Sequence, residues 1–143
     1  MDLNNLERVL VPIDFSHLSF VAIRTALSIG PPEKIHLLNV LPVASGLAWA
    51  AGMDLADDQV RVEGVRMRVD RELMANGIDP TGMHLHVRVG SAGPEIVDFA
   101  NQHEPHLIII GSHGQKGSIE RLLMGSVAYS VVRSATRSVL VIR

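Results

Sequence analysis

The chain of 143 residues contains no cysteine, which excludes disulfide bonds and thiolate metal sites. Aromatic residues are scarce, with one Trp, one Tyr and three Phe, so a base-stacking platform for single-stranded nucleic acid is not expected. No apolar run approaches the roughly 20 residues that a membrane-spanning helix needs. We therefore expect neither nucleic acid nor a membrane among the partners of this chain.

Charged residues make up only 20% of the chain and give a net charge of −2, whereas hydrophobic residues make up 47%. This balance gives no basic field that would attract nucleic acid. The first residues lack the basic region followed by an apolar run that is typical of a signal peptide. We expect one cytoplasmic domain over residues 1–143, with a full hydrophobic core.

Short apolar runs alternate with helical patterns along the chain. Apolar runs that predict buried strands cover residues 8–13, 35–40 and 106–110, and a last strand is predicted at residues 138–143. Residues 83–89 alternate between apolar and polar, which predicts an edge strand. Helices are predicted near residues 18–29, 55–74, 94–102 and 126–135, and residues 43–53 as a flap or short irregular helix. The alternation predicts an α/β fold, with a parallel open sheet and helices on both faces.

A glycine-rich stretch follows the fourth predicted strand. Gly111 and Gly114 end that strand, and the chain restarts as a helix at Gly125 and Ser126. Glycine lets backbone N–H groups approach an anion closely, and a helix N-terminus adds unpaired donors. Strand, glycine loop and helix start together predict a phosphate cradle. A plain strand-to-helix turn would use the same glycines, so this pattern alone leaves both readings open.

Asp14 directly follows the first predicted strand. Ligands of open α/β sheets bind beyond the carboxyl ends of strands where the strand order reverses. If the first and fourth strands are neighbours, Asp14 and the glycine loop line one crevice. Asp14 is then a ligand acceptor, or it forms an Asx turn that caps the next helix.

Three segments resemble the universal stress protein family, and the likeness covers nearly the whole chain. They are residues 9–16 (Val-Leu-Val-Pro-Ile-Asp-Phe-Ser), residues 109–114 (Ile-Ile-Gly-Ser-His-Gly), and Gly125-Ser126 followed by residues 139–142. The resemblance implies a Rossmann-like fold of the adenine nucleotide alpha hydrolase type, with five parallel strands in the order 3-2-1-4-5.

The resemblance also implies a ligand, which is ATP or another adenine nucleotide, accompanied by Mg²⁺ or Mn²⁺. The adenine would lie near Pro12, Asp14 and Val40. The phosphates would lie near Gly111, Gly114, Gly125 and Ser126. The function implied is that of a regulatory or stress-response module.

One spacing departs from the family pattern. ATP-binding members carry nine residues between the second and third glycines, whereas ten residues separate Gly114 from Gly125 here. That difference favours an alternative, which is a nucleotide-independent homodimeric interaction module of the same fold.

No catalytic residue is predicted, because no general base stands beside the expected phosphates, so any ATP hydrolysis should be slow. Ser112 and His113 are sequence neighbours, which rarely gives a nucleophile and its base productive geometry. His84 and His86 share a strand face but lack a third metal ligand, so a solvated face is expected and no metal site. Lys116 is either a phosphate partner or a solvated loop residue.

The last strand is expected to lie at an edge of the sheet. Residues 139–142 form an apolar run without charge or proline, unlike most edge strands. A homodimer that pairs this strand with its own copy would cover the edge. The resemblance points to the same interface.

Overall fold

The computed structural model describes residues 6–43, 58–115 and 124–143. Its elements are β1 (Val9–Pro12), α1 (His17–Ile29), the 3-10 helix η2 (Pro32–Lys34), β2 (Ile35–Leu41), α3 (Asp58–Ala75), β3 (His84–Val89), α4 (Ala92–His103), β4 (Leu107–Gly111), α5 (Ser126–Ser134) and β5 (Ser138–Ile142). Three predictions fall on residues outside these ranges: Lys116, most of the irregular segment expected at 43–53, and the start of a helix at Leu55.

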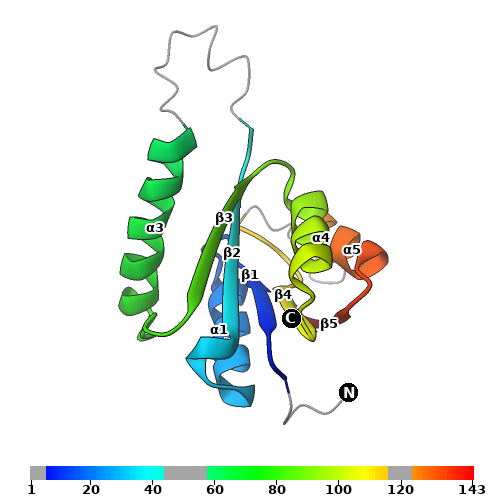
Figure 1. Cartoon of the computed structure of the whole chain (residues 1–143), viewed down its shortest axis with the longest axis horizontal. Coiled ribbons are helices and arrows are strands. Elements are labelled where there is room, and N and C mark those ends of the chain that lie inside the picture. The colour runs from blue at the N-terminus through cyan, green and yellow to red at the C-terminus, as the bar shows by residue number, and fades with distance from the viewer. Residues whose placement is uncertain (1–5, 44–57, 116–123) are drawn as a thin grey trace, which may run out of the picture.

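The five strands form one parallel sheet in the order β3-β2-β1-β4-β5, which confirms the expected order (Figure 1). β1 pairs with β2 on one side and with β4 on the other, so the strand order reverses between β1 and β4. The carboxyl ends of these two strands therefore flank the crevice where such sheets bind ligands.

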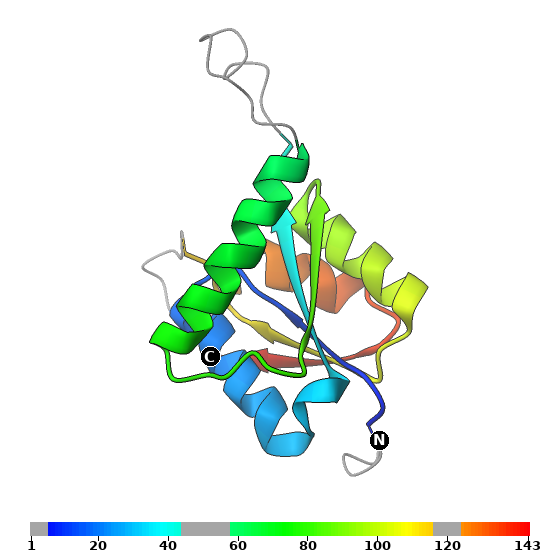
Figure 2. The same cartoon turned by 60° about the vertical axis from the view of Figure 1, so that its left-hand side comes forward.

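Helices cover both faces of the sheet, as expected. Figures 1 and 2 show α3 on one side of the sheet and the α4–α5 pair on the other. Val9 and Ile109 pack into the core cluster that includes residues of α1 and α3, whereas Leu10 and Ile108 pack into the cluster of α4 and α5. Because successive strand residues bury on opposite faces, β1 and β4 are apolar throughout.

Helix α1 begins where its sequence signals place it. The hydroxyl of Ser16 accepts a hydrogen bond from the N–H of Ser19 at 3.3 Å, which confirms Ser16 as the N-cap. Phe20 and Ile23 are buried, and Leu27 packs against the same cluster. The helix therefore presents the predicted stripe to the sheet.

The polar face of β3 is less solvated than expected. His84 is exposed, but His86 and Arg88 are half-buried beneath α4. His86 lies against the ring of Phe99, with the ring centroids 4.8 Å apart. The sequence pattern correctly separated the two faces of this edge strand, but it did not show that a helix covers part of the polar one.

Candidate functional site

A pocket of about 670 Å³ opens at the carboxyl ends of β1, β2 and β4, within the 300–1,000 Å³ typical of small-molecule sites. The N-terminal ends of α4 and α5 close its sides. All seven residues that the sequence suggested for a nucleotide site line this pocket: Pro12, Asp14, Val40, Gly111, Gly114, Gly125 and Ser126. Residues from four separate segments of the chain are thus brought together at the switch point.

One wall of the pocket is apolar. Val40 and Leu38 project from β2, Ile110 from β4, and Ile96 from α4. Sequence reasoning found only Val40 among these four. The two-residue spacing of Leu38 and Val40 could have suggested their shared face, but nothing local indicates that Ile96 of α4 faces them.

Asp14 ties the end of β1 to the glycine loop. Its Oδ1 accepts the N–H of Ser16 at 3.0 Å, and its Oδ2 accepts the N–H of Gln115 at 3.1 Å. Between them, Phe15 adopts the left-handed backbone conformation with φ 63°, which aims the chain into α1. Asp14 therefore forms the turn before α1 and also lies in the crevice, so both sequence readings of this residue are compatible with the geometry.

Neighbouring atoms lie close to the Cα atoms of the three glycines, so that a Cβ at any of them would be crowded. A Cβ at Gly114 would lie 2.5 Å from Oδ2 of Asp14, and one at Gly125 would lie 3.0 Å from the carbonyl oxygen of Ser112. A Cβ at Gly111 would lie 2.8 Å from the Cβ of Leu18. Larger residues would displace pocket-lining groups at Gly114 and Gly125, and would push against Leu18 of α1 at Gly111.

The start of α5 forms the other side of the cradle. Gly125 is the N-cap, with φ −62° and ψ 158°, and as a glycine it has no side chain that could accept a hydrogen bond from the first turn. Ser126 is the first helical residue and lines the pocket. The first-turn N–H groups of a helix have no intrahelical acceptor, so this end of α5 supplies donors and a partial positive charge.

The side chains of Ser112 and His113 are in contact. Oγ of Ser112 lies 2.9 Å from Nδ1 of His113. Ser112 is only 2% exposed, however, and Nε2 of His113 is buried without a hydrogen-bond partner in the described structure. A buried hydroxyl whose base lacks an orienting carboxylate does not have the geometry of an activated nucleophile.

Charge in the pocket is sparse. Asp14 is the one carboxylate among the lining residues, and neither Lys nor Arg lines the pocket in the described ranges. Across residues 6–43, 58–115 and 124–143, no group of three or more His, Asp or Glu is arranged to hold a metal ion. None of the helices in those ranges is both long and apolar enough to cross a bilayer.

Known proteins share this fold and chain length. The family model described as Universal stress protein family matches residues 5–143. Universal stress protein G of Salmonella typhi is 33% identical over 141 residues, which cover 94% of this chain and 97% of the relative.

Two of the similar solved structures are universal stress proteins. Universal stress protein UspA from Lactobacillus plantarum has a TM-score of 0.69 and 26% identity, covering 95% of this chain and 97% of its own. A universal stress protein from Archaeoglobus fulgidus, solved in complex with dAMP, has a TM-score of 0.59 and 21% identity, covering 95% and 97%. The family match spans nearly all of the described fold and every residue of the pocket, so this chain belongs to the universal stress protein family.

Proposed function

We propose that this chain binds ATP or another adenine nucleotide in the pocket at the switch point and acts as a regulatory or stress-response module. The observation that carries the proposal is the convergence of Gly111, Gly114 and Gly125 with the start of α5 on one side of a pocket whose other side is apolar. A nucleotide needs both surfaces, one for its base and one for its phosphates. The related protein solved with dAMP supports the same ligand class.

The polarity of the pocket sets the orientation that we propose. The base lies against Pro12 and Val40, where the lining is apolar. The phosphates lie towards Gly114, Gly125 and Ser126, where backbone N–H groups and the Ser126 hydroxyl can donate.

A divalent cation fits this arrangement. Asp14, which the family resemblance placed beside the adenine, has its carboxylate against Gly114, on the side that we propose for the phosphates, and would repel them unless a cation intervenes. Oxygen atoms of Asp14 and of the phosphates are ligands that Mg²⁺ or Mn²⁺ accepts, and the bound ion would neutralise the triphosphate. Catalysis is a lesser part of the proposal, because no activated base lines the pocket in the described residues and hydrolysis should be slow.

Calorimetric titration at pH 7.5 with ATP, with dAMP and with ATP plus MgCl₂ tests the proposal. We expect saturable binding with one nucleotide per chain and tighter ATP binding when Mg²⁺ is present. Absorbance at 260 nm and mass spectrometry of the freshly purified, then denatured, protein would show any nucleotide retained from the cell. The absence of both binding and retained nucleotide would refute the proposal.

A second candidate is the nucleotide-independent homodimeric module. In its favour, two backbone N–H groups of the loop already have acceptors within the protein. The N–H of Gln115 donates to Asp14, and the N–H of Gly125 donates to the carbonyl oxygen of Ser112 at 2.7 Å. A loop that satisfies its own donors can persist without an anion. A stable dimer that binds no nucleotide in the titrations would favour this candidate.

Asp14→Ala should weaken nucleotide binding more than it destabilises the fold. The exposed carboxylate accepts two backbone N–H bonds, one of them from Gln115 of the glycine loop. Its loss removes a ligand of the proposed cation and a contact that holds the loop, and should cost about 1–2 kcal/mol of binding free energy. Asp14→Asn, which keeps an acceptor and loses the charge, separates the two contributions. A lower melting temperature with unchanged affinity would reduce Asp14 to a helix-capping role.

We also propose a cytoplasmic homodimer built on β5. β5 pairs with β4 on one side only in the described sheet, and Leu140 of β5 and Tyr129 and Val132 of α5 are exposed. Leu140 is 40% exposed and projects from the strand, so Leu140→Lys should place two like charges in a two-fold interface and yield a monomer. Light scattering measures the mass, and a parent chain that is monomeric at micromolar concentration would contradict the interface.

A further inference from the structure

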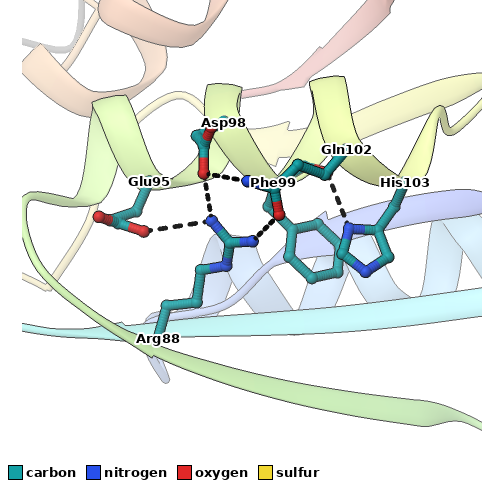
Figure 3. A network of polar contacts seen from close by, with 6 residues as sticks. All are labelled: Arg88, Glu95, Asp98, Phe99, Gln102 and His103. Atoms are coloured by element: carbon teal, nitrogen blue, oxygen red, sulfur yellow. Dashed lines mark hydrogen bonds and ion pairs between the residues drawn. The ribbon is translucent and has the colours of Figure 1, made fainter.

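Five aromatic rings form a continuous row between the sheet and α4, on the side of β3 away from α3. The rings follow the order His84, His36, His86, Phe99, His103. Ring centroids of His36 lie 4.7 Å from His84 and 5.2 Å from His86, with both pairs stacked. Phe99 and His103 stack at 3.8 Å, and Figure 3 shows them side by side on α4. We call these five residues the histidine row.

The hydrogen bonds of the row limit how many protons it can carry. Nδ1 of His36 and Nε2 of His86 are 2.9 Å apart, so one of them donates and the other must be an unprotonated acceptor. Nε2 of His84 donates to the carbonyl oxygen of Glu33, and Nδ1 of His103 donates to that of Phe99. The bond survives one added proton, because an imidazolium can donate to a neutral imidazole, but protonation of both rings would set two N–H donors against each other and break it.

Cations surround the row. The charged and polar groups near the row are Arg8 before β1, Glu33 of η2, Arg88 of β3, and Glu95, Asp98 and Gln102 of α4. Arg66 of α3, on the other side of β3, acts on His86 only through its charge. The guanidinium of Arg88 forms ion pairs with Asp98 and Glu95, as Figure 3 shows, with Nη1 2.6 Å from Asp98 and 3.3 Å from Glu95. Glu95 and Asp98 are therefore already paired with Arg88 and are poor partners for an imidazolium.

The same surroundings favour neutral imidazoles. Burial, followed by the charges of His84, His86, Arg8 and His103, lowers the pKa of His36 from 6.5 to about 4. Burial, followed by the charge of His103, also lowers the pKa of His86. The unfolded or opened chain therefore binds more protons than the closed row between pH 6.5 and about 4.

Helix α4 belongs to both the row and the pocket. Its C-terminal half carries Phe99 and His103 into the row, and its N-terminal half carries Ala92 and Ile96 into the pocket wall. β2 is shared in the same way, with His36 in the row and Val40 in the pocket. Movement of α4 away from β2 and β3 would open both.

We propose that the histidine row is an acid-sensitive latch, which holds α4 against the sheet at neutral pH and releases it in mildly acidic solution, thereby weakening ligand binding in the pocket. The release of α4 stands on the geometry of the row, whereas its effect on a ligand rests on the proposed function. The latch is closed above pH 6.5 and opens as the pH falls towards 4, because each added proton places a like charge near Arg8 and Arg88, and protonation of both His36 and His86 breaks the bond between them.

Hydrogen exchange of the peptide that covers α4 tests the release. It is measured at pH 7.5 and pH 5.5, with EDTA present to exclude metal binding and with correction for the intrinsic exchange rate. If opening of α4 requires one imidazole to take up a proton, the population of the open form rises about tenfold for each pH unit below the ordinary pKa of that imidazole. We expect α4 to lose about tenfold in protection at pH 5.5, while α1, on the other face of the sheet, keeps its protection.

The double variant His36→Leu/His86→Phe keeps an apolar row that cannot take up protons at the central pair. Its α4 should show equal protection at both pH values, and His106→Gln, an exposed histidine outside the row, should behave as the parent does. If the double variant does not fold, the single variant His86→Phe is used instead, because it removes the same hydrogen bond. Equal protection of parental α4 at the two pH values would overturn the latch.

Addition of ATP at pH 5.5 tests the link to the pocket. A ligand that binds only the closed form should restore protection of α4 in the parent. ATP binding at pH 7.5 with pH-independent protection of α4 would refute the latch and leave the proposed function intact. Absence of ATP binding at pH 7.5 with acid-sensitive α4 would refute the proposed function and support the latch.

Discussion

Gly114→Val is expected to weaken adenine nucleotide binding by more than about tenfold, the equivalent of losing at least one charge-assisted hydrogen bond, while the fold survives. Even a methyl group at this position would lie 2.5 Å from Oδ2 of Asp14. Asp14 can relieve the clash by swinging away, because its carboxylate is the free end of a side chain. It would then release the N–H of Gln115, and the branched side chain would fill the space proposed for phosphate.

A matched glycine isolates the effect of position 114. A Cβ at Gly30, the C-cap of α1, meets no atom within 4 Å, so Gly30→Val introduces the same side chain without a clash. Calorimetric titration with ATP should separate the two variants, while their circular dichroism spectra agree with the parent. Parental affinity in Gly114→Val would contradict the assignment of the glycine loop to phosphate.

The sheet could be predicted because its signals are local. Residues 9–12 and 107–111 are short apolar runs, and a strand buried on both faces needs no partner to be recognised. The alternation of strands with helices then restricts the topology through right-handed crossovers. The strand order itself rested on the family resemblance, which the pairing of β1 with β2 and β4 confirms.

The histidine row could not be predicted, because its members come from three elements. His84 and His86 share a face by period, but their contact with His36 depends on the register of β2 against β3. The approach of Phe99 and His103 depends on how α4 lies across that edge. Pattern analysis of one strand therefore indicated a polar face and could not show what covers it.

The pocket was predicted better at its polar corners than along its walls. Glycines and Asp14 mark turns, whose chemistry is visible in the sequence. Leu38, Ile96 and Met124 are ordinary apolar residues, and only packing shows that they line the pocket. The N-cap of α5 is Gly125, which has no side chain with which to cap the first turn, and Ser126 is the first residue inside the helix.

Gly93→Val should be strongly destabilising, because α4 and α5 touch at this residue. Gly93 is buried, and a Cβ there would lie 2.6 Å from Oγ and 2.9 Å from Cβ of Ser130. Overpacking of this kind costs about 2–3 kcal/mol, which corresponds to a Tm lower by roughly 5–10 °C for a domain of this size. Thermal unfolding followed by circular dichroism measures the shift. Because Ala92 and Val127 line the pocket beside this contact, nucleotide affinity should fall as well.

Two further variants show whether the contact with Ser130 is the cause. Gly64→Val places the same side chain on the exposed face of α3, where a Cβ meets nothing within 4 Å, and its Tm should change little. A double-mutant cycle combines Gly93→Ala with Ser130→Gly. By itself, Ser130→Gly lowers the stability of α5, because glycine is a poor helix former. In the background of Gly93→Ala, however, it should restore about 1 kcal/mol of the unfolding free energy that Gly93→Ala removes. Additive effects in the cycle would show that the α4–α5 contact does not limit the size of residue 93, and would remove the steric explanation.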